Sequence, residues 1–337
     1  MISRRKQLYP LSNSFNQYLF HFGRYSPIPL DYNELHAFTN TVPYFNPDGE
    51  ETLWLTLGYP PEVMDTLRPK LTAIYATLKV GGKSNFHQHL TVDRIDFGDF
   101  GNSRPFRIRI KNQINGNSDY YYVKTADASR LYGLELEHLL SPNRLNYLVN
   151  YQTLIEEHIA GVPGDIFLRD YLPRPDLNQI RIAKEFTKFN ERCFFRLLGD
   201  MRSVNYVVDI TPDFEEIQYR VRPIDFDQQS YEGKSKTYLA YRFQSNKPIT
   251  RLAFDVLDRK TIDQYVNEER TQMAHRARIE RTRLTALLSV MRKDTIAPEA
   301  NFQTLRADLQ RFFPNENLSD CQTMGQLTAN HLELMLR

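Results

Sequence analysis

The sequence has few cysteines, little net charge and no long hydrophobic run. Only Cys193 and Cys321 are present in 337 residues, too few for a disulfide framework, which fits a reducing compartment. No apolar run approaches about 18 residues, the length that marks a membrane-spanning helix. The formal charge of +2 gives no overall attraction to nucleic acid or membrane. The basic amino terminus lacks the apolar core of a secretory signal, so we expect a cytoplasmic protein without a membrane partner.

What the sequence does contain is enough apolar material for more than one core. Hydrophobic residues make up 41% of the chain and aromatic residues 12%. A chain of this length is expected to form about two or three compact units. No internal repeat or low-complexity segment is present, and turn signals divide the chain near residues 90 and 165.

The most informative stretch runs from 199 to 227, where Asn205 follows Asp200 by five positions and Asp225 comes 20 positions later. Phosphoryl transfer from a nucleotide needs one carboxylate near the acceptor hydroxyl and hard oxygen ligands for Mg²⁺. Segments 206–208 and 221–224 alternate like two short strands that pair as a hairpin, with 209–220 as the connection. This hairpin is expected to deliver Asp225 beside Asn205.

The same stretch resembles the catalytic loop and metal-binding strand of the protein-kinase-like fold, specifically the branch of aminoglycoside phosphotransferases and choline kinases. That branch reads H-G-D-x-H-x-x-N, then a hydrophobic strand and I-D-F or I-D-W. The residues that fall on this pattern are Gly199, Asp200, Asn205, Ile224, Asp225 and Phe226. Leu198 and Arg202 stand where the family has histidines, and Asp227 follows the last motif.

The resemblance implies an α+β fold of two lobes, a small antiparallel β-sheet lobe at 91–165 and a mainly helical lobe at 166–337. Residues 1–90 would be an amino-terminal α/β extension that packs on the small lobe. The helical lobe would carry the catalytic loop at 199–205 and the metal strand at 221–227. A long helix at 177–197 would lead into the catalytic loop.

The implied activity is an ATP- and Mg²⁺-dependent transfer of the γ-phosphoryl group to a hydroxyl of an unidentified small molecule. Asp200 would be the base or acceptor-positioning carboxylate, and Asn205 and Asp225 the metal ligands. Asp227 and Arg202 are additional candidates for the site. Acceptor selection would fall to the region after Asp227.

Upstream residues fit a nucleotide-binding lobe in the order expected of one. Strands are predicted at 92–97 and 106–110, and Gly98 and Gly101 in the turn between them could let backbone N–H groups approach phosphate. A third strand at 119–124 ends in Lys124, the predicted phosphate-contacting lysine.

A helix is predicted at 128–140, and it carries two glutamates that could reach Lys124. Glu135 is preferred over Glu137, although the apolar residues do not fix the buried face uniquely. A strand at 153–159 resembles the segment whose backbone binds adenine, with Glu157 and Ile159 as the nucleotide contacts in a hinge at 157–161.

Several alternatives stay open. A non-catalytic pseudokinase, acting as a nucleotide-responsive or structural binding module with a protein partner, would explain Leu198 and Arg202. Nucleotidyl transfer cannot be separated from phosphoryl transfer. The arginine-rich segment 270–283 could bind nucleic acid, but interspersed glutamates and missing aromatics favour a solvated, ion-paired face. The acceptor, the role of residues 1–90 and the oligomeric state are not determined by the sequence.

Overall fold

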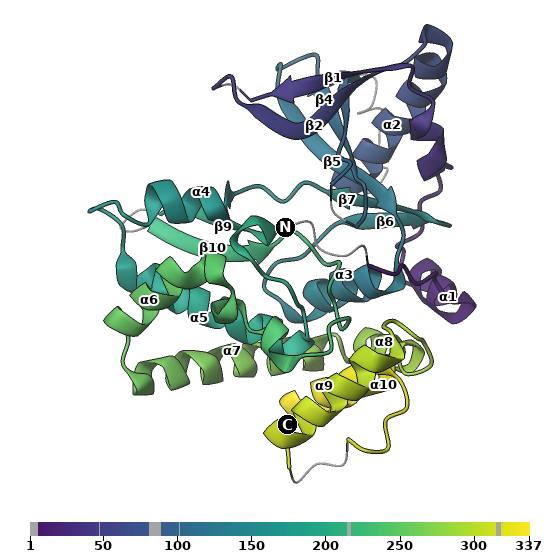
Figure 1. Cartoon of the computed structure of the whole chain (residues 1–337). Helices are drawn as coiled ribbons and strands as arrows, with labels where there is room; N and C mark the ends of the chain where they lie inside the picture. Colours follow the sequence, from purple (N-terminus) through teal and green to yellow (C-terminus); the bar gives the residue numbers. More distant parts are fainter. Residues whose placement is uncertain (1–5, 47, 81–88, 101, 214–216, 315–317) are drawn as a thin grey trace. The chain divides into compact units, whose positions relative to one another are not determined.

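The computed structural model describes residues 6–46, 48–80, 89–100, 102–213, 217–314 and 318–337. The fold is α+β, and its contacts divide the chain into two compact units. Unit 1 comprises Met1–Asp127 and Leu145–His158, and unit 2 comprises Ala128–Arg144 and Ile159–Arg337. Figure 1 shows the strands of unit 1 in colours from purple to teal and the helices of unit 2 in colours from teal through green to yellow.

Unit 1 is built on an antiparallel sheet, which within the described residues has seven strands in the order β1-β2-β3-β4-β5-β7-β6. The strands are β1 Asn40–Phe45, β2 Glu51–Gly58, β3 Leu90–Phe97, β4 Phe106–Asn112, β5 Ser118–Thr125, β6 Tyr147–Asn150 and β7 Thr153–Glu157. Unit 1 also contains α1 (Asn13–His21), a short 3₁₀ helix (Tyr32–His36) and α2 (Pro61–Val80). The strands predicted around 92–97, 106–110, 119–124 and 153–159 are confirmed, each with slightly different ends.

The core of unit 1 lies between the sheet and α2, which Figure 1 shows beside the strands. In β4, Phe106, Ile108 and Ile110 are buried, whereas the alternating arginines face the other side of the sheet. This alternation follows from the two-residue period of a strand. Tyr121 of β5 is fully buried, and its hydroxyl donates to the Leu71 carbonyl of α2 at 3.0 Å.

Residues 1–90 are not a separate extension of unit 1, because β1 and β2 are strands of its sheet. Leu55 and Thr56 of β2 pair with Phe97 and Asp96 of β3. Across this join, the Thr56 hydroxyl donates to Asp96 Oδ1 at 2.8 Å. Strands β1 and β6 and helix α1 were not predicted from the sequence.

Unit 2 is mainly helical, with a small antiparallel sheet in the order β10-β9-β8. Its strands are β8 Val162–Pro163, β9 Tyr206–Pro212 and β10 Ile217–Pro223. Its helices are α3 Ala128–Leu140, α4 Gly164–Ile166, α5 Gln179–Arg196, α6 Lys247–Val256, α7 Arg259–Ile279, α8 Arg281–Met291, α9 Glu299–Phe312 and α10 Met324–Met335. The predicted helices at 128–140 and 177–197 are confirmed as α3 and α5, and Glu280 separates α7 from α8.

Buried ion pairs connect the helices of unit 2. Glu137 of α3 pairs with Arg196 of α5, and both side chains are fully buried. Glu135, also on α3, receives hydrogen bonds from Arg283 of α8 at 2.6 to 3.0 Å. A lone buried charge is costly, so each of these groups needs its partner. The pairs explain why α3 clusters with unit 2 although the sequence predicted it in the small lobe.

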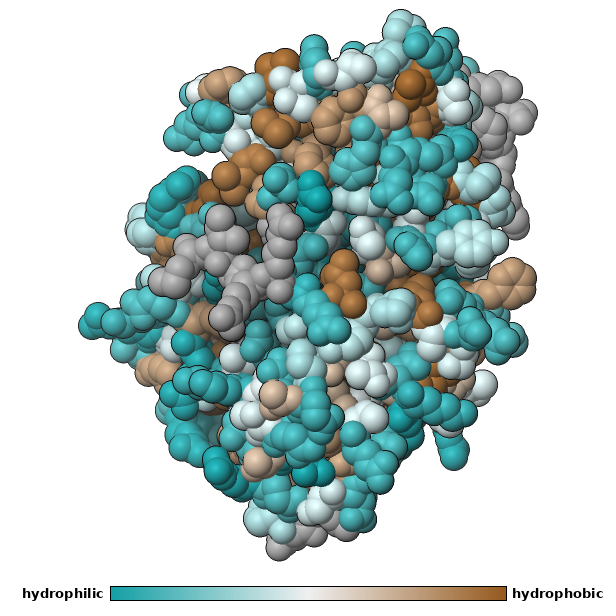
Figure 2. All heavy atoms as spheres, turned by 45° about the vertical axis from the view of Figure 1, so that its right-hand side comes forward, coloured by the Kyte–Doolittle hydropathy of each residue, from teal (hydrophilic) through white to brown (hydrophobic). Residues whose placement is uncertain are grey.

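The surface gives no sign of a membrane-spanning segment. In the part of the chain that the structure describes, no helix is long and apolar enough to cross a bilayer. Figure 2 shows hydrophobic residues scattered among polar ones on the face that it displays.

Candidate functional site

The loop that follows α5 is held by backbone hydrogen bonds from two later segments of unit 2. Helix α5 ends at Leu197, which has φ +55°, and the Gly199 N–H donates to the Gln228 carbonyl at 3.1 Å. The Asp200 N–H donates to the Thr237 carbonyl at 3.2 Å. Asp200 itself has φ +57°, a conformation that Asp adopts more readily than most residues. The loop therefore has one defined conformation.

Within this loop, the side chains of Asp200, Arg202 and Asn205 contact one another. Asp200 Oδ2 accepts from Arg202 Nη2 at 2.7 Å, and Asn205 Nδ2 donates to the Asp200 carbonyl at 2.7 Å. The hydrogen bond with Asp200 raises the pKa of Arg202. Asp200 keeps 26% of its side chain exposed, so a substrate hydroxyl could reach it.

The predicted hairpin is confirmed, and just beyond its strands the residue that precedes Asp225 pairs with Asn205 through the backbone. Strands β9 and β10 pair in a register that places Pro223 opposite Tyr206. Just beyond the last pair, the Ile224 N–H donates to the Asn205 carbonyl at 3.0 Å. The strands are longer than predicted, since they extend to Pro212 and begin again at Ile217.

The two aspartates of the I-D-F-D motif have different surroundings. The Asp225 side chain is 35% exposed, and its Oδ1 accepts from the Asp227 N–H at 3.0 Å. Asp227 is buried and paired with Arg130 of α3, whose side chain is only 1% exposed. Asp225 is thus the accessible carboxylate, whereas Asp227 stabilises the loop from within.

Asn205 and Asp225 are the residues that the sequence predicted as metal ligands. Among the described residues, no group of three His, Cys, Asp or Glu side chains could hold a metal ion. Mg²⁺ keeps several waters and binds through one or two carboxylates together with substrate phosphates. Asp225 offers a carboxylate, and Asn205 offers its amide oxygen because its nitrogen donates to Asp200. By themselves, one carboxylate and one amide oxygen provide too few ligands for a resident ion held by protein groups alone.

Glu232 is a site residue that sequence reasoning missed. It is half-buried, and burial raises its pKa, with a further contribution from the charge of Asp200. The Tyr238 hydroxyl donates to the Glu232 carbonyl at 2.6 Å. This bond fixes the segment whose Thr237 carbonyl accepts from the Asp200 N–H. Glu232 lies within the Y-E-G-K stretch at 231–234, which carries no signal of this proximity. Lys234 and Lys236, which follow in the same segment, are exposed.

The predicted partners Lys124 and Glu135 each form an ion pair with another residue. Lys124 Nζ lies 2.5 Å from Glu156 Oε2 of β7, within unit 1. Glu135 pairs with Arg283, within unit 2. Each of the two charges is therefore compensated within its own unit. The sequence could not show this, because Glu156 lies 32 residues after Lys124 and Arg283 lies 148 after Glu135.

The predicted phosphate turn is partly described. Gly98 donates its N–H to the Pro105 carbonyl at 2.9 Å and closes the β3–β4 turn. A Cβ at Gly98 would lie 2.6 Å from the Phe100 ring, so close packing against that ring explains the glycine. Gly101 lies outside the described residues.

The predicted hinge coincides with a boundary between the units. Glu157 ends β7 in unit 1, and Ile159 begins the second segment of unit 2. The Glu157 carboxylate accepts from the Asn146 backbone and side-chain amides at 2.7 and 3.2 Å. The Glu157 side chain is therefore engaged within unit 1, and a nucleotide contact there would use the backbone.

The arginine-rich segment of α7 and α8 is anchored to other helices. Arg270 pairs with Glu191 at 2.6 Å, and Arg283 pairs with Glu135. Arg276 Nη1 donates to the Ser141 carbonyl at 2.7 Å. These contacts favour the ion-paired interpretation over a surface for nucleic acid.

No protein-family model matches the chain, and no curated protein sequence matches it either.

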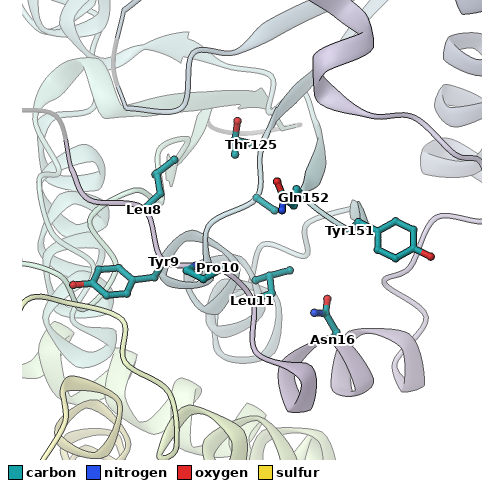
Figure 3. Close-up of a pocket in the computed structure, with 9 residues that line it drawn as sticks. Leu8, Tyr9, Pro10, Leu11, Asn16, Thr125, Tyr151 and Gln152 are labelled. Atoms are coloured by element: carbon teal, nitrogen blue, oxygen red, sulfur yellow. The ribbon is translucent and has the colours of Figure 1, made fainter.

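Unit 1 also contains a hollow of about 390 Å³ that shares no residue with the predicted site. Figure 3 shows the residues that line it, which come from the amino-terminal segment, α1, the end of β5 and the β6–β7 turn. They are Leu8, Tyr9, Pro10, Leu11, Asn16, Thr125, Ala126, Tyr151 and Gln152. Among the described lining residues there is no carboxylate, imidazole or amine, and the titratable side chains are those of Tyr9 and Tyr151.

Proposed function

We propose that the protein is an ATP- and Mg²⁺-dependent phosphotransferase that moves the γ-phosphoryl group to a hydroxyl of a small-molecule acceptor. The observation that carries the proposal is the arrangement of Asp200, Asn205 and Asp225 in unit 2. Asn205 bonds the Asp200 backbone through its side chain at 2.7 Å and Ile224 through its carbonyl at 3.0 Å. One residue thus links the loop of the proposed base to the segment of the proposed metal ligand, through its side chain on one side and its backbone on the other.

Each residue has a role that its surroundings suit. Asp200 orients the acceptor hydroxyl and accepts its proton, as the positioned carboxylate does in phosphoryl transfer. Arg202, held at 2.7 Å from Asp200, adds positive charge beside the transferring group. Asp225 and Asn205 would hold Mg²⁺, which, when bound with ATP, neutralises charge on the phosphate oxygens.

The order of elements along the chain also supports the proposal. Strand β5 carries Lys124, α3 follows with Glu135, and strands β6 and β7 lead to the unit boundary after His158. Nucleotide-binding lobes of the proposed kind have this succession of strand, helix and strands. In the proposal, Lys124 contacts the phosphates and 157–161 the adenine.

A second candidate function is nucleotide-responsive binding without transfer. The pairings of Lys124 with Glu156 and of Glu135 with Arg283 favour it, because they occupy the two charges that an active lobe would pair with each other. In this case the fold would bind a nucleotide or a protein partner and would transfer nothing.

Transfer of the phosphoryl group distinguishes the two functions. We would incubate γ-labelled ATP and Mg²⁺ with pools of hydroxyl-bearing acceptors, using wild type, Asp200→Asn and Asp225→Asn. A labelled product that needs both aspartates supports the phosphotransferase. Binding of ATP without a product in any pool would support the second function, and a product formed equally by all three proteins would contradict the assigned residues.

A further inference from the structure

Helix α3 contacts the segment that carries Asp225 at several points within unit 2. Ser129 Oγ donates to the Gln229 carbonyl at 2.6 Å. Gly133 is packed so closely that a Cβ there would lie 3.0 Å from Gln229 Cβ and 3.1 Å from Phe226 Cβ. Only glycine allows this approach without a shift of the neighbours. The first turns of α3 therefore form the wall against which residues 226–229 pack.

Arg130 lies at the centre of this contact. Its guanidinium pairs with Asp227, and its Nη2 lies 3.8 Å from Asp225 Oδ1. Asp227 in turn donates its backbone N–H to the same Asp225 oxygen at 3.0 Å. One oxygen of the proposed metal ligand is thus fixed by a backbone N–H, and the residue that provides this N–H is anchored to Arg130.

The rest of α3 is anchored independently. Glu135 pairs with Arg283 and Glu137 pairs with Arg196, and both glutamates are fully buried. A helix fixed by such pairs provides a rigid support, because breaking a buried pair leaves an uncompensated buried charge. Arg130 is therefore presented to the Asp225 loop from a rigid element.

We propose that Arg130 is a positioning residue that sets the orientation of the Asp225 carboxylate through Asp227. The inference rests on the proposed function, since Asp225 is there the Mg²⁺ ligand. Arg130 itself does not contact the metal. Partners of metal ligands typically change metal affinity by about 10–100-fold when they are removed.

Two effects of Arg130 must be separated in a test. Its positive charge near Asp225 opposes a cation, whereas its hold on Asp227 orients the ligand. The double variant Arg130→Met/Asp227→Asn removes one charge of each sign, so the net charge beside Asp225 is unchanged. It also avoids a lone buried carboxylate, which would destabilise the fold. Any weakening of Mg²⁺ binding in this variant then reports a changed orientation of the Asp225 carboxylate and not a change of net charge.

The experiment measures the thermal unfolding midpoint at increasing Mg²⁺ concentration and fixed ATP. It compares wild type, the double variant and a control. The control is Glu191→Gln/Arg270→Met, which removes a pair of 2.6 Å between α5 and α7. We expect the Mg²⁺ concentration that gives half of the full rise in thermal midpoint to be about 10-fold higher or more in the double variant than in wild type. In the control it should equal the wild-type value.

The outcomes separate this inference from the proposed function. An unchanged Mg²⁺ midpoint in the double variant, with a normal shift in wild type, would overturn the role of Arg130 alone. A wild type that shows no Mg²⁺-dependent shift would overturn the proposed function and this inference with it. An equal loss in the control would assign the effect to general destabilisation and would also contradict the inference.

Discussion

Asp200 has φ +57°, and this backbone conformation allows its geometric and chemical roles to be tested separately. A left-handed conformation costs most L residues about 1–2 kcal/mol, whereas Asn and Asp adopt it routinely. The Asp200–Arg202 pair is partly exposed, at 26% and 41%, so its net contribution to stability is at most about 1 kcal/mol. Asp200→Asn should therefore cost less than about 1 kcal/mol, and Asp200→Ala about 1–2 kcal/mol more than that.

The assay is equilibrium urea unfolding of wild type, Asp200→Asn and Asp200→Ala. The three free energies of unfolding are compared provided that their dependence on urea concentration has the same slope. The hydrogen bond from Asn205 should survive in both variants, because it is made to the Asp200 backbone carbonyl. If Asp200 acts as the base, transfer in Asp200→Asn should fall by about 10²- to 10⁴-fold although the fold is intact. An alanine variant as stable as the asparagine variant would refute the backbone argument, and equal transfer would refute the role as base.

Further predictions concern the packing and the buried charges of unit 2. Arg196→Met leaves the fully buried Glu137 without its partner and should lower the free energy of unfolding by about 3–5 kcal/mol. In urea unfolding, Arg196→Met/Glu137→Gln should recover most of that loss, and no recovery would contradict the pairing. Burial lowers the pKa of His331 from 6.5 to about 4. The unfolded chain then binds the proton more readily than the folded chain does. The contribution of neutral His331 to the free energy of unfolding is therefore complete above pH 6.5 and falls by about 3 kcal/mol as the pH is lowered toward 4. In urea denaturation at pH 4.5 and pH 7, the free energy of unfolding of His331→Leu should therefore change less between the two pH values than that of wild type. An equal change in both proteins would contradict the assignment. A Cβ at Gly164 would lie 2.3 Å from the Tyr206 ring. Gly164→Ala should therefore overpack this site, destabilise the fold by about 1–3 kcal/mol and lower the thermal midpoint. An unshifted midpoint would show that the ring moves freely.

Local sequence patterns predicted the regular elements well where their periodicity was strong. The alternation of β4 and the capped, apolar-periodic stretches of α3 and α5 correspond closely to the structure. Strands β1 and β6 were missed because β1 is largely exposed and contains Pro43, and β6 is only four residues long. The assignment of residues 1–90 as an extension was wrong, because strand pairing between Thr56 and Asp96 depends on residues 40 positions apart.

For the candidate site, the sequence predicted what is close along the chain and missed what is distant. The hairpin that places Asp225 after Asn205 was predictable, since its register follows from two adjacent apolar runs. The contacts of Arg130 with Asp227 and of Lys124 with Glu156 were not, because a charged residue has many opposite charges to choose from and only the fold selects one.

The most direct test of the proposed site is the thermal midpoint of the protein with ATP alone, with Mg²⁺ alone and with both. A ligand that binds only the folded state stabilises it by about 2.7 kcal/mol at a hundredfold excess over its dissociation constant. We predict a shift that requires ATP and Mg²⁺ together in wild type and is lost in Asp225→Asn. The same shift in Asp225→Asn, or no shift of the wild type under any condition, would contradict the proposed site.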